Sequence, residues 1–164
     1  MLPQVKVGVG CFVVRRVAGA TQFLLGERHG GLSPGLWGLP GGHLEFGEQW
    51  SDCAQRETHE ECGVNIADWR HVATTNDIFE NSHYVTVFMK AEFDAERMRV
   101  KLAEPHKCKQ WIWVSWEELC RRQSTLRNAC TSKTSDLASV EFSPFHSLQS
   151  LQTLYANKYP PWLQ

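Results

Sequence analysis

The sequence has no long apolar run. The longest, residues 8–14 and 84–89, are far shorter than the roughly 18 to 20 residues that cross a bilayer. The first residues also lack the charged and apolar regions of a signal peptide. We therefore expect a soluble, cytoplasmic protein that makes no contact with a membrane.

Runs of lysine and arginine longer than a pair are also absent. Seventeen basic and 18 acidic residues leave a formal charge of -1, so no basic field is available to hold a long nucleic acid. The six cysteines are scattered, with no C-x-x-C pair and no Cys/His spacing typical of a zinc site. This pattern favours reduced thiols that pack as small apolar groups in a reducing compartment.

The composition is that of one globular domain. With 164 residues, 42% of them apolar, the chain can build a single core, and we expect one domain over residues 1–164. Apolar alternation and turn residues predict strands at 5–14, 22–25, 36–39, within 64–79, at 83–93 and at 110–114. Strands around two helices in this order predict an α/β or α+β sandwich and not a doubly wound parallel sheet.

Helices are predicted from capping signals. Residues 49–62 contain neither glycine nor proline, and Gly63 stands where a helix C-cap is needed. Ser115 followed by Glu118 forms a capping box for a second, short helix. The Ser/Thr-rich stretch 122–143 is predicted to be a flexible loop, residues 145–155 a closing helix, and the tail from Pro160 loose.

Three glutamates, Glu57, Glu60 and Glu61, lie on the helix predicted at 49–62. One face of that helix would carry, at spacings of three and four residues, Trp50, Cys53, Ala54, Glu57 and Glu61. Since buried carboxylates without compensation are strongly unfavourable, the cluster requires cations. Oxygen ligands without His or Cys favour hard divalent ions, Mg2+ in particular. Taken alone, the same pattern is also typical of a solvated acidic helix face.

The segment before the helix favours the functional interpretation. Gly41 and Gly42 allow the backbone to approach a ligand closely, and residues 43–48 lead into the helix N-terminus, where N–H groups favour anions. Arg56 is adjacent to Glu57 and is suited to orienting its carboxylate. A phosphate-binding loop and a metal-binding face are thus connected in sequence.

These residues resemble the Nudix box, G-x5-E-x7-R-E-U-x-E-E-x-G-U, over residues 42–64. Gly42, Glu48 and the run Arg56-Glu57-Thr58-His59-Glu60-Glu61-Cys62-Gly63-Val64 match every charged and glycine position. Only Thr58 departs from the pattern, at a position that is usually aliphatic and that concerns helix packing.

The resemblance implies a Nudix fold, an α/β/α sandwich with a mixed β-sheet, over nearly the whole chain. It implies that Glu57, Glu60, Glu61 and the Gly41 carbonyl hold Mg2+, with Mn2+ as a substitute, and that Arg56 orients Glu57. The reaction would be metal-assisted, in-line attack of water on phosphorus. The general base would be Glu57 or a loop residue outside the box.

Substrate class is narrowed by elimination. The chain has no proline between Pro40 and Pro105, so it lacks the proline that marks ADP-ribose hydrolases. Tyr84 lies slightly too far from the box for the tyrosine of dinucleoside polyphosphate hydrolases, and the zinc-ribbon extension of NADH pyrophosphatases is missing. A MutT-type nucleoside triphosphate diphosphatase is favoured.

Segments 39–48, 53–58, 83–90 and 111–119 together resemble the human-type diphosphatases of thiopurine and (deoxy)guanosine triphosphates. The small-molecule substrate would then be a nucleotide, dGTP or a modified purine nucleotide, cleaved to monophosphate and pyrophosphate. Arg28 and the loop residues Gly41, Gly42 and His43 would bind the substrate, and Thr86 would lie near the base.

The same resemblance implies a homodimer. The chain after Leu119 matches poorly, which leaves base preference open, and His43 would equally suit a packing role in its turn. A cap fragment or a nucleotide sugar is an alternative substrate. A non-catalytic module that binds nucleotides is an alternative from another functional class.

Overall fold

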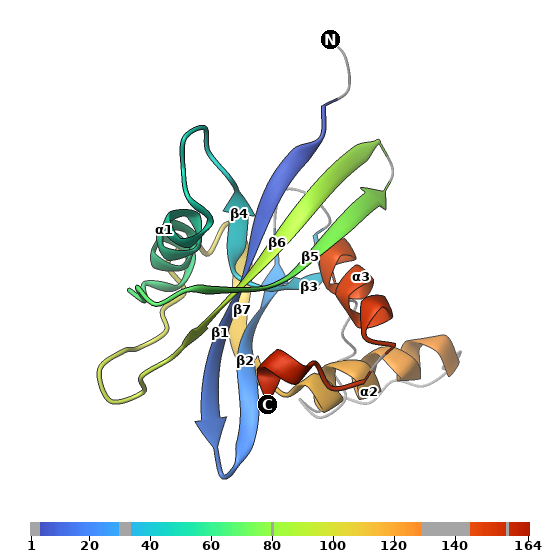
Figure 1. Ribbon diagram of the computed structural model, residues 1–164. Helices are drawn as coiled ribbons and strands as arrows, with labels where there is room; N and C mark the ends of the chain where they lie inside the picture. Colours follow the sequence, from blue (N-terminus) through green and yellow to red (C-terminus); the bar gives the residue numbers. More distant parts are fainter. Residues whose placement is uncertain (1–3, 30–33, 80, 129–144, 157) are drawn as a thin grey trace.

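The computed structural model describes residues 4–29, 34–79, 81–128, 145–156 and 158–164, which form one sheet with helices on both faces (Figure 1). The strands are β1 (Lys6–Val17), β2 (Ala20–Arg28), β3 (Trp37–Gly38), β4 (Gly41–His43), β5 (Arg70–Phe79), β6 (Ser82–Glu92) and β7 (Cys108–Val114). The helices are α1 (Trp50–Cys62), α2 (Trp116–Asn128), α3 (His146–Leu154) and a short 3-10 turn, η2 (Pro161–Leu163).

The sheet is mixed. Its strands follow the order β3-β2-β1-β6-β5, with β4 paired to β1 and β7 paired to β2. Strands β1 and β6 are parallel, whereas the other pairs are antiparallel. The predicted α/β fold with a mixed sheet is confirmed.

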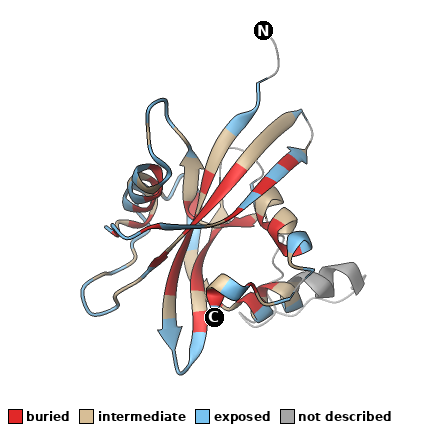
Figure 2. Cartoon of the chain, viewed as in Figure 1, coloured by how far each residue is buried: buried red, intermediate tan, exposed pale blue. Residues whose placement is uncertain are grey.

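Successive residues of β1 alternate between two separate cores, one on each face of the sheet. In Figure 2 the buried residues concentrate along the strands, between the helices. Phe12 and Val14 join the core beneath α2 and α3, and Cys11 and Val13 join the core beneath α1. The alternating apolar pattern of this strand therefore produces the α/β/α sandwich.

Helix α1 begins and ends within one residue of the predicted bounds. Gly63 adopts a left-handed conformation (φ 67°); its N–H donates to the His59 carbonyl oxygen at 3.0 Å, and the Val64 N–H donates to that of Thr58 at 3.4 Å. Buried Thr58 satisfies its hydroxyl by donating to Ala54 O at 2.7 Å, so the polar residue fits the packed face. Trp50, expected on that face, is instead 44% exposed, because it lies in the first turn beside the ring of His71.

Strand β7 and helix α2 follow the predicted pattern at their junction. Trp111 and Trp113 contact the core beneath α1, whereas Ile112 and Val114 contact the opposite core. The Glu118 N–H donates to Ser115 Oγ at 3.1 Å, as in the predicted capping box.

Helix α2 is longer than expected. It continues to Asn128, so the prediction of a loop is wrong for residues 122–128, which contain no glycine or proline to end a helix. The remainder of that predicted loop, residues 129–143, lies outside the described residues.

The C-terminal tail, predicted to be loose, is packed. Leu163 is buried, and the rings of Trp162 and Phe12 pack edge to face with their centroids 4.8 Å apart. Trp162 Nε1 also donates to the Tyr155 hydroxyl at 2.8 Å. These apolar contacts with β1 and α3 order a tail whose local sequence carries no helix or strand signal. Among the described helices, none is both long and apolar enough to cross a lipid bilayer.

Candidate active site

A cavity of about 550 Å³ opens beside α1 and reaches α3. This volume lies within the range of small-molecule sites. Its charged part is lined by Gly41, Gly42, Arg56, Glu57, Glu60 and Glu61. Its aromatic part is lined by Asp77, Phe79, Tyr84, Thr86 and Phe145.

Two glycines let α1 approach the sheet closely. A Cβ at Gly42 would lie 2.2 Å from Glu57 Oε1, and a Cβ at Gly41 would lie 2.1 Å from the Val9 carbonyl oxygen. Gly41 also has a φ of 150°, a conformation that side chains disfavour. The Gly41 N–H donates to Glu61 Oε2 at 3.1 Å. Both predicted loop glycines therefore contact the glutamate cluster directly.

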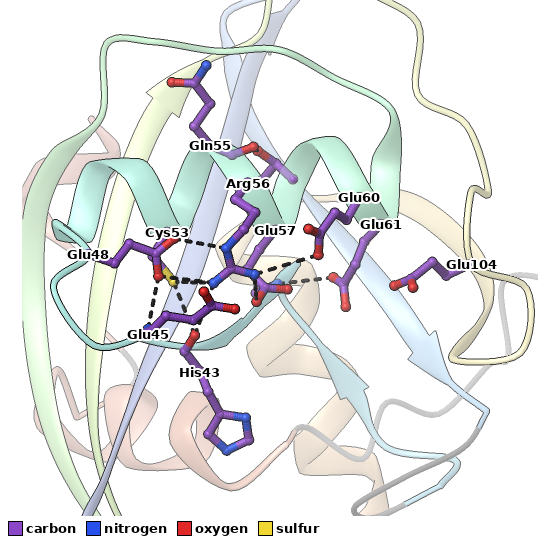
Figure 3. A network of polar contacts seen from close by, with 12 residues as sticks. His43, Glu45, Glu48, Cys53, Gln55, Arg56, Glu57, Glu60, Glu61 and Glu104 are labelled. Atoms are coloured by element: carbon purple, nitrogen blue, oxygen red, sulfur yellow. Dashed lines mark hydrogen bonds and ion pairs between the residues drawn. The ribbon is translucent and has the colours of Figure 1, made fainter.

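Arg56 connects the carboxylates (Figure 3). Its guanidinium donates to both oxygens of Glu48, at 2.8 and 3.0 Å, and to Glu57 Oε1 at 2.7 Å. Glu60 Oε2 lies 3.6 Å from the same group. These bonds lower the pKa of Glu48 to about 2, while Glu48 and Glu57 raise that of Arg56. The arginine is thus placed to fix the orientation of Glu57.

Glu61 has a strongly raised pKa. Burial raises its pKa to about 7, the Gly41 N–H opposes this shift, and the charge of Glu57 adds to it. Glu57 is buried and Glu61 is half-buried, whereas the Glu60 side chain is 47% exposed. The helical spacing predicted this division, with Glu60 at the margin of the buried face.

The donor set fits a hard divalent cation. Carboxylate oxygens and a backbone carbonyl are ligands that Mg2+ prefers, and the charge of Glu57 contributes to the raised pKa of Glu61, an unfavourable proximity that a bound cation would relieve. In the described part of the chain, no three His, Cys, Asp or Glu side chains are already arranged around a common metal position. Arg56 contacts Glu57 through Oε1 and Glu60 through Oε2, which leaves the other oxygen of each carboxylate to bind a metal.

Two residues from the loop before β7 were not predicted. Glu104 lies beside Glu61, and its charge contributes to the raised Glu61 pKa (Figure 3). Lys107 pairs with Glu104 at 2.8 Å and lines the cavity. The only sequence signal was their position just ahead of a strong strand.

Arg28 and His43 line the cavity, as predicted for substrate-binding residues. The guanidinium of Arg28 lies over the Phe145 ring, 4.7 Å from its centroid, and burial lowers its pKa. His43 Nε2 is 2.9 Å from the hydroxyl of Tyr84, so its ring is held by that contact in the structure. Both are within reach of a ligand in the cavity.

The aromatic part of the cavity brings together residues distant in sequence. The Phe79 ring is stacked with that of His146, at 4.1 Å between centroids, and with that of Tyr84, at 5.8 Å. Thr86, predicted near a base, lies in this wall and donates to Asp77 Oδ2 at 2.5 Å. Sequence reasoning did not identify Phe79, Phe145 or Asp77.

The sequence profile of the NUDIX domain matches residues 5–156. The chain belongs to the NUDIX family. It resembles a MutT NUDIX hydrolase from Burkholderia pseudomallei, with a TM-score of 0.61 and 25% identity over 70% of this chain and 85% of that one.

Two further structures share the fold. For a MutT protein from Methanosarcina mazei Go1 the TM-score is 0.63, with 22% identity over 74% of this chain and 84% of that one. For a C. elegans Ap4A hydrolase the TM-score is 0.59, with 23% identity over 71% of this chain and 84% of that one. The chain is a Nudix pyrophosphohydrolase.

Proposed function

We propose that this Nudix hydrolase cleaves nucleoside triphosphates, with dGTP or modified purine nucleotides preferred, to a monophosphate and pyrophosphate. The observation that carries the proposal is one cavity that joins a carboxylate cluster to cations and to flat aromatic walls. A nucleotide needs these three environments for its metal-bound phosphates, its remaining phosphate charge and its base. The resemblance to human-type diphosphatases of (deoxy)guanosine triphosphates supports the substrate choice.

In this proposal Glu57, Glu60, Glu61 and the Gly41 carbonyl hold Mg2+ or Mn2+, which would activate water and neutralise developing charge on phosphorus. Arg56 positions Glu57 through their 2.7 Å contact. The loop glycines allow substrate to approach the backbone.

Cations outside the carboxylate cluster bind the phosphates. Arg28 and Lys107 line the cavity from two different segments, and His43 lies at the end of β4, ahead of α1. Arg28 would bind phosphate with two parallel hydrogen bonds, which Lys107 is unable to do. Thr86 lies in the wall that faces the base.

The general base is Glu57 or a residue of a loop outside the box. Glu104 is the loop carboxylate closest to this description, because its charge acts directly on Glu61. Comparing the pH–rate profile of Glu104→Gln with that of wild type separates the two. Loss of the acidic limb in Glu104→Gln would identify Glu104 as the base, and an unchanged limb would assign the role to Glu57.

A second candidate substrate is a dinucleoside polyphosphate. Tyr84, which lies too far along the sequence for the usual motif, nevertheless lines the cavity. The fold shared with a C. elegans Ap4A hydrolase is compatible with this reaction. A cap fragment or a nucleotide sugar would also place a diphosphate at the carboxylates.

The test is a substrate panel analysed by chromatography. Purified protein is incubated with Mg2+ and dNTPs, modified dGTPs, ADP-ribose, Ap4A, cap analogues and nucleotide sugars. We expect the highest kcat/KM for purine triphosphates, with monophosphate and pyrophosphate in equal amounts. Faster cleavage of Ap4A or a linked diphosphate would contradict the substrate assignment, and binding without turnover would favour a non-catalytic module.

The resemblance that guides the substrate choice also leads us to propose a single domain over residues 1–164, a homodimer and a cytoplasmic location. Sedimentation of the purified protein tests the dimer. A single species with the mass of one chain would contradict it.

A further inference from the structure

Asp77 on β5 is a buried carboxyl in the aromatic wall of the cavity. It is 3% exposed and contributes to the cavity lining. Its Oδ2 accepts hydrogen bonds from Thr75 Oγ1 at 2.9 Å and Thr86 Oγ1 at 2.5 Å. Its other oxygen, Oδ1, is buried and has no hydrogen-bond partner among the residues that the structure describes.

An oxygen in this state is unusual in a folded protein. Leaving a buried acceptor without a hydrogen bond is unfavourable, and more so if the group is charged. The two threonine hydroxyls fix the carboxyl, so Oδ1 is held in one position. A bound ligand that donates a hydrogen bond to Oδ1 would satisfy this acceptor and offset the cost of removing it from water.

The surroundings define the ligand group. Phe79 and Phe145 line the cavity together with Asp77, so this part of the cavity has an aromatic, apolar lining that suits a nucleobase. A phosphate would be repelled by a carboxylate, so this part of the cavity suits the base end of a nucleotide.

An ionised carboxylate only accepts hydrogen bonds, so the base must present a donor. Guanine and hypoxanthine carry N–H at ring position N1, whereas adenine has an acceptor there. We propose that Asp77 selects 6-oxopurine nucleotides by accepting the N1–H at Oδ1. The inference rests on the proposed function, because it assumes that the base of the substrate occupies this wall.

The geometry predicts an inversion in the variant Asp77→Asn. The hydroxyls of Thr75 and Thr86 donate to one oxygen, and only the carbonyl oxygen of an asparagine is able to accept them. The asparagine NH2 group would therefore replace Oδ1. A fixed acceptor becomes a fixed donor, which matches the acceptor at N1 of adenine.

The experiment measures equilibrium binding of dGMP, dIMP and dAMP, with Mg2+ present, to wild type, Asp77→Asn and Asn76→Ala. Wild type should bind dGMP and dIMP at least about tenfold more tightly than dAMP, and Asp77→Asn should change this ratio about 10- to 100-fold in favour of dAMP. Asn76→Ala is the matched control, because Asn76 is the exposed neighbour of Asp77 on β5 and does not line the cavity. It should keep the wild-type preference.

A ligand series on wild type makes the test independent of how the variant folds. N1-methyl-dGMP, which lacks the donor, should bind at least about tenfold more weakly than dGMP. Equal binding of these two ligands would overturn the proposal. Equal weakening of all three monophosphates by Asp77→Asn would overturn it as well.

Turnover of triphosphates is measured separately. If wild type releases no monophosphate from any triphosphate while the binding pattern holds, the proposed function fails and Asp77 keeps its role. If triphosphates are cleaved but Asp77→Asn leaves the base preference unchanged, the role of Asp77 alone is wrong.

Discussion

Replacing Glu61 by Gln should stabilise the metal-free protein at neutral pH and also remove its activity. Burial raises the pKa of Glu61 from 4.5 to about 7, so the charged form is disfavoured in the folded state. Glutamine keeps an oxygen that accepts the hydrogen bond from the Gly41 N–H. It removes only the charge that a cation would otherwise compensate.

The size of the effect follows from the shifted pKa. A rise of about 2.5 in the pKa of Glu61 corresponds to about 3 kcal/mol of unfolding free energy. Because the charge of Glu57 contributes to this rise, we expect Glu61→Gln to be more stable than wild type by about 2–3 kcal/mol. Because the folded pKa is raised, wild type loses stability as pH rises from about 4.5 to about 7. The advantage of Glu61→Gln should be absent at about pH 4.5 and complete above about pH 7.

Urea unfolding in EDTA at about pH 5 and about pH 8 measures this difference. Glu60→Gln is the matched control, since its side chain is 47% exposed and we expect a change below about 0.5 kcal/mol. Adding Mg2+ should stabilise wild type more than Glu61→Gln. The reasoning is refuted if Glu61→Gln is less stable than wild type at the higher pH, or if its advantage is the same at both.

Three further changes test other contacts. Gly42→Ala places a Cβ 2.2 Å from Glu57 Oε1, so kcat/KM should fall at least about 100-fold while circular dichroism shows a retained fold. Glu48→Gln should cost about 1 kcal/mol at neutral pH, after allowance for solvent screening of its pair with Arg56. Because the pKa of Glu48 is lowered to about 2, this difference in urea stability should disappear as pH falls from about 4.5 towards 2. Trp162→Ala should lower the free energy of unfolding by about 1–2 kcal/mol and leave kcat unchanged; unchanged stability would show that the tail packing is unimportant.

Local patterns predicted most of the fold. Alternation in β1 and β7 fixed which residues enter each core, and Gly63 marked the end of α1. The tail differs, because Pro160 and its neighbours carry turn signals, yet Leu163 is buried through contacts with strands far away in the chain. Tertiary packing decided that segment, and no local spacing reports it.

The charged half of the site was predictable because it is local. Glycines, Arg56 and the glutamates lie within one loop and one helix, where fixed spacing determines which side chains meet. Asp77, Phe145 and Glu104 come from β5, the start of α3 and the loop before β7. Their proximity depends on the order of strands in the sheet. The sequence alone therefore did not reveal the aromatic part of the cavity or the carboxylate of Glu104.

The central claim is that the glutamates of α1 form a metal-dependent centre that splits nucleoside triphosphates into monophosphate and pyrophosphate. The most direct measurement follows dGTP by chromatography with wild type and Glu57→Gln, each in Mg2+ and in EDTA. The account predicts dGMP and pyrophosphate in equal amounts, only from wild type and only with Mg2+. Release of dGDP and phosphate, or equal turnover by Glu57→Gln, would contradict it.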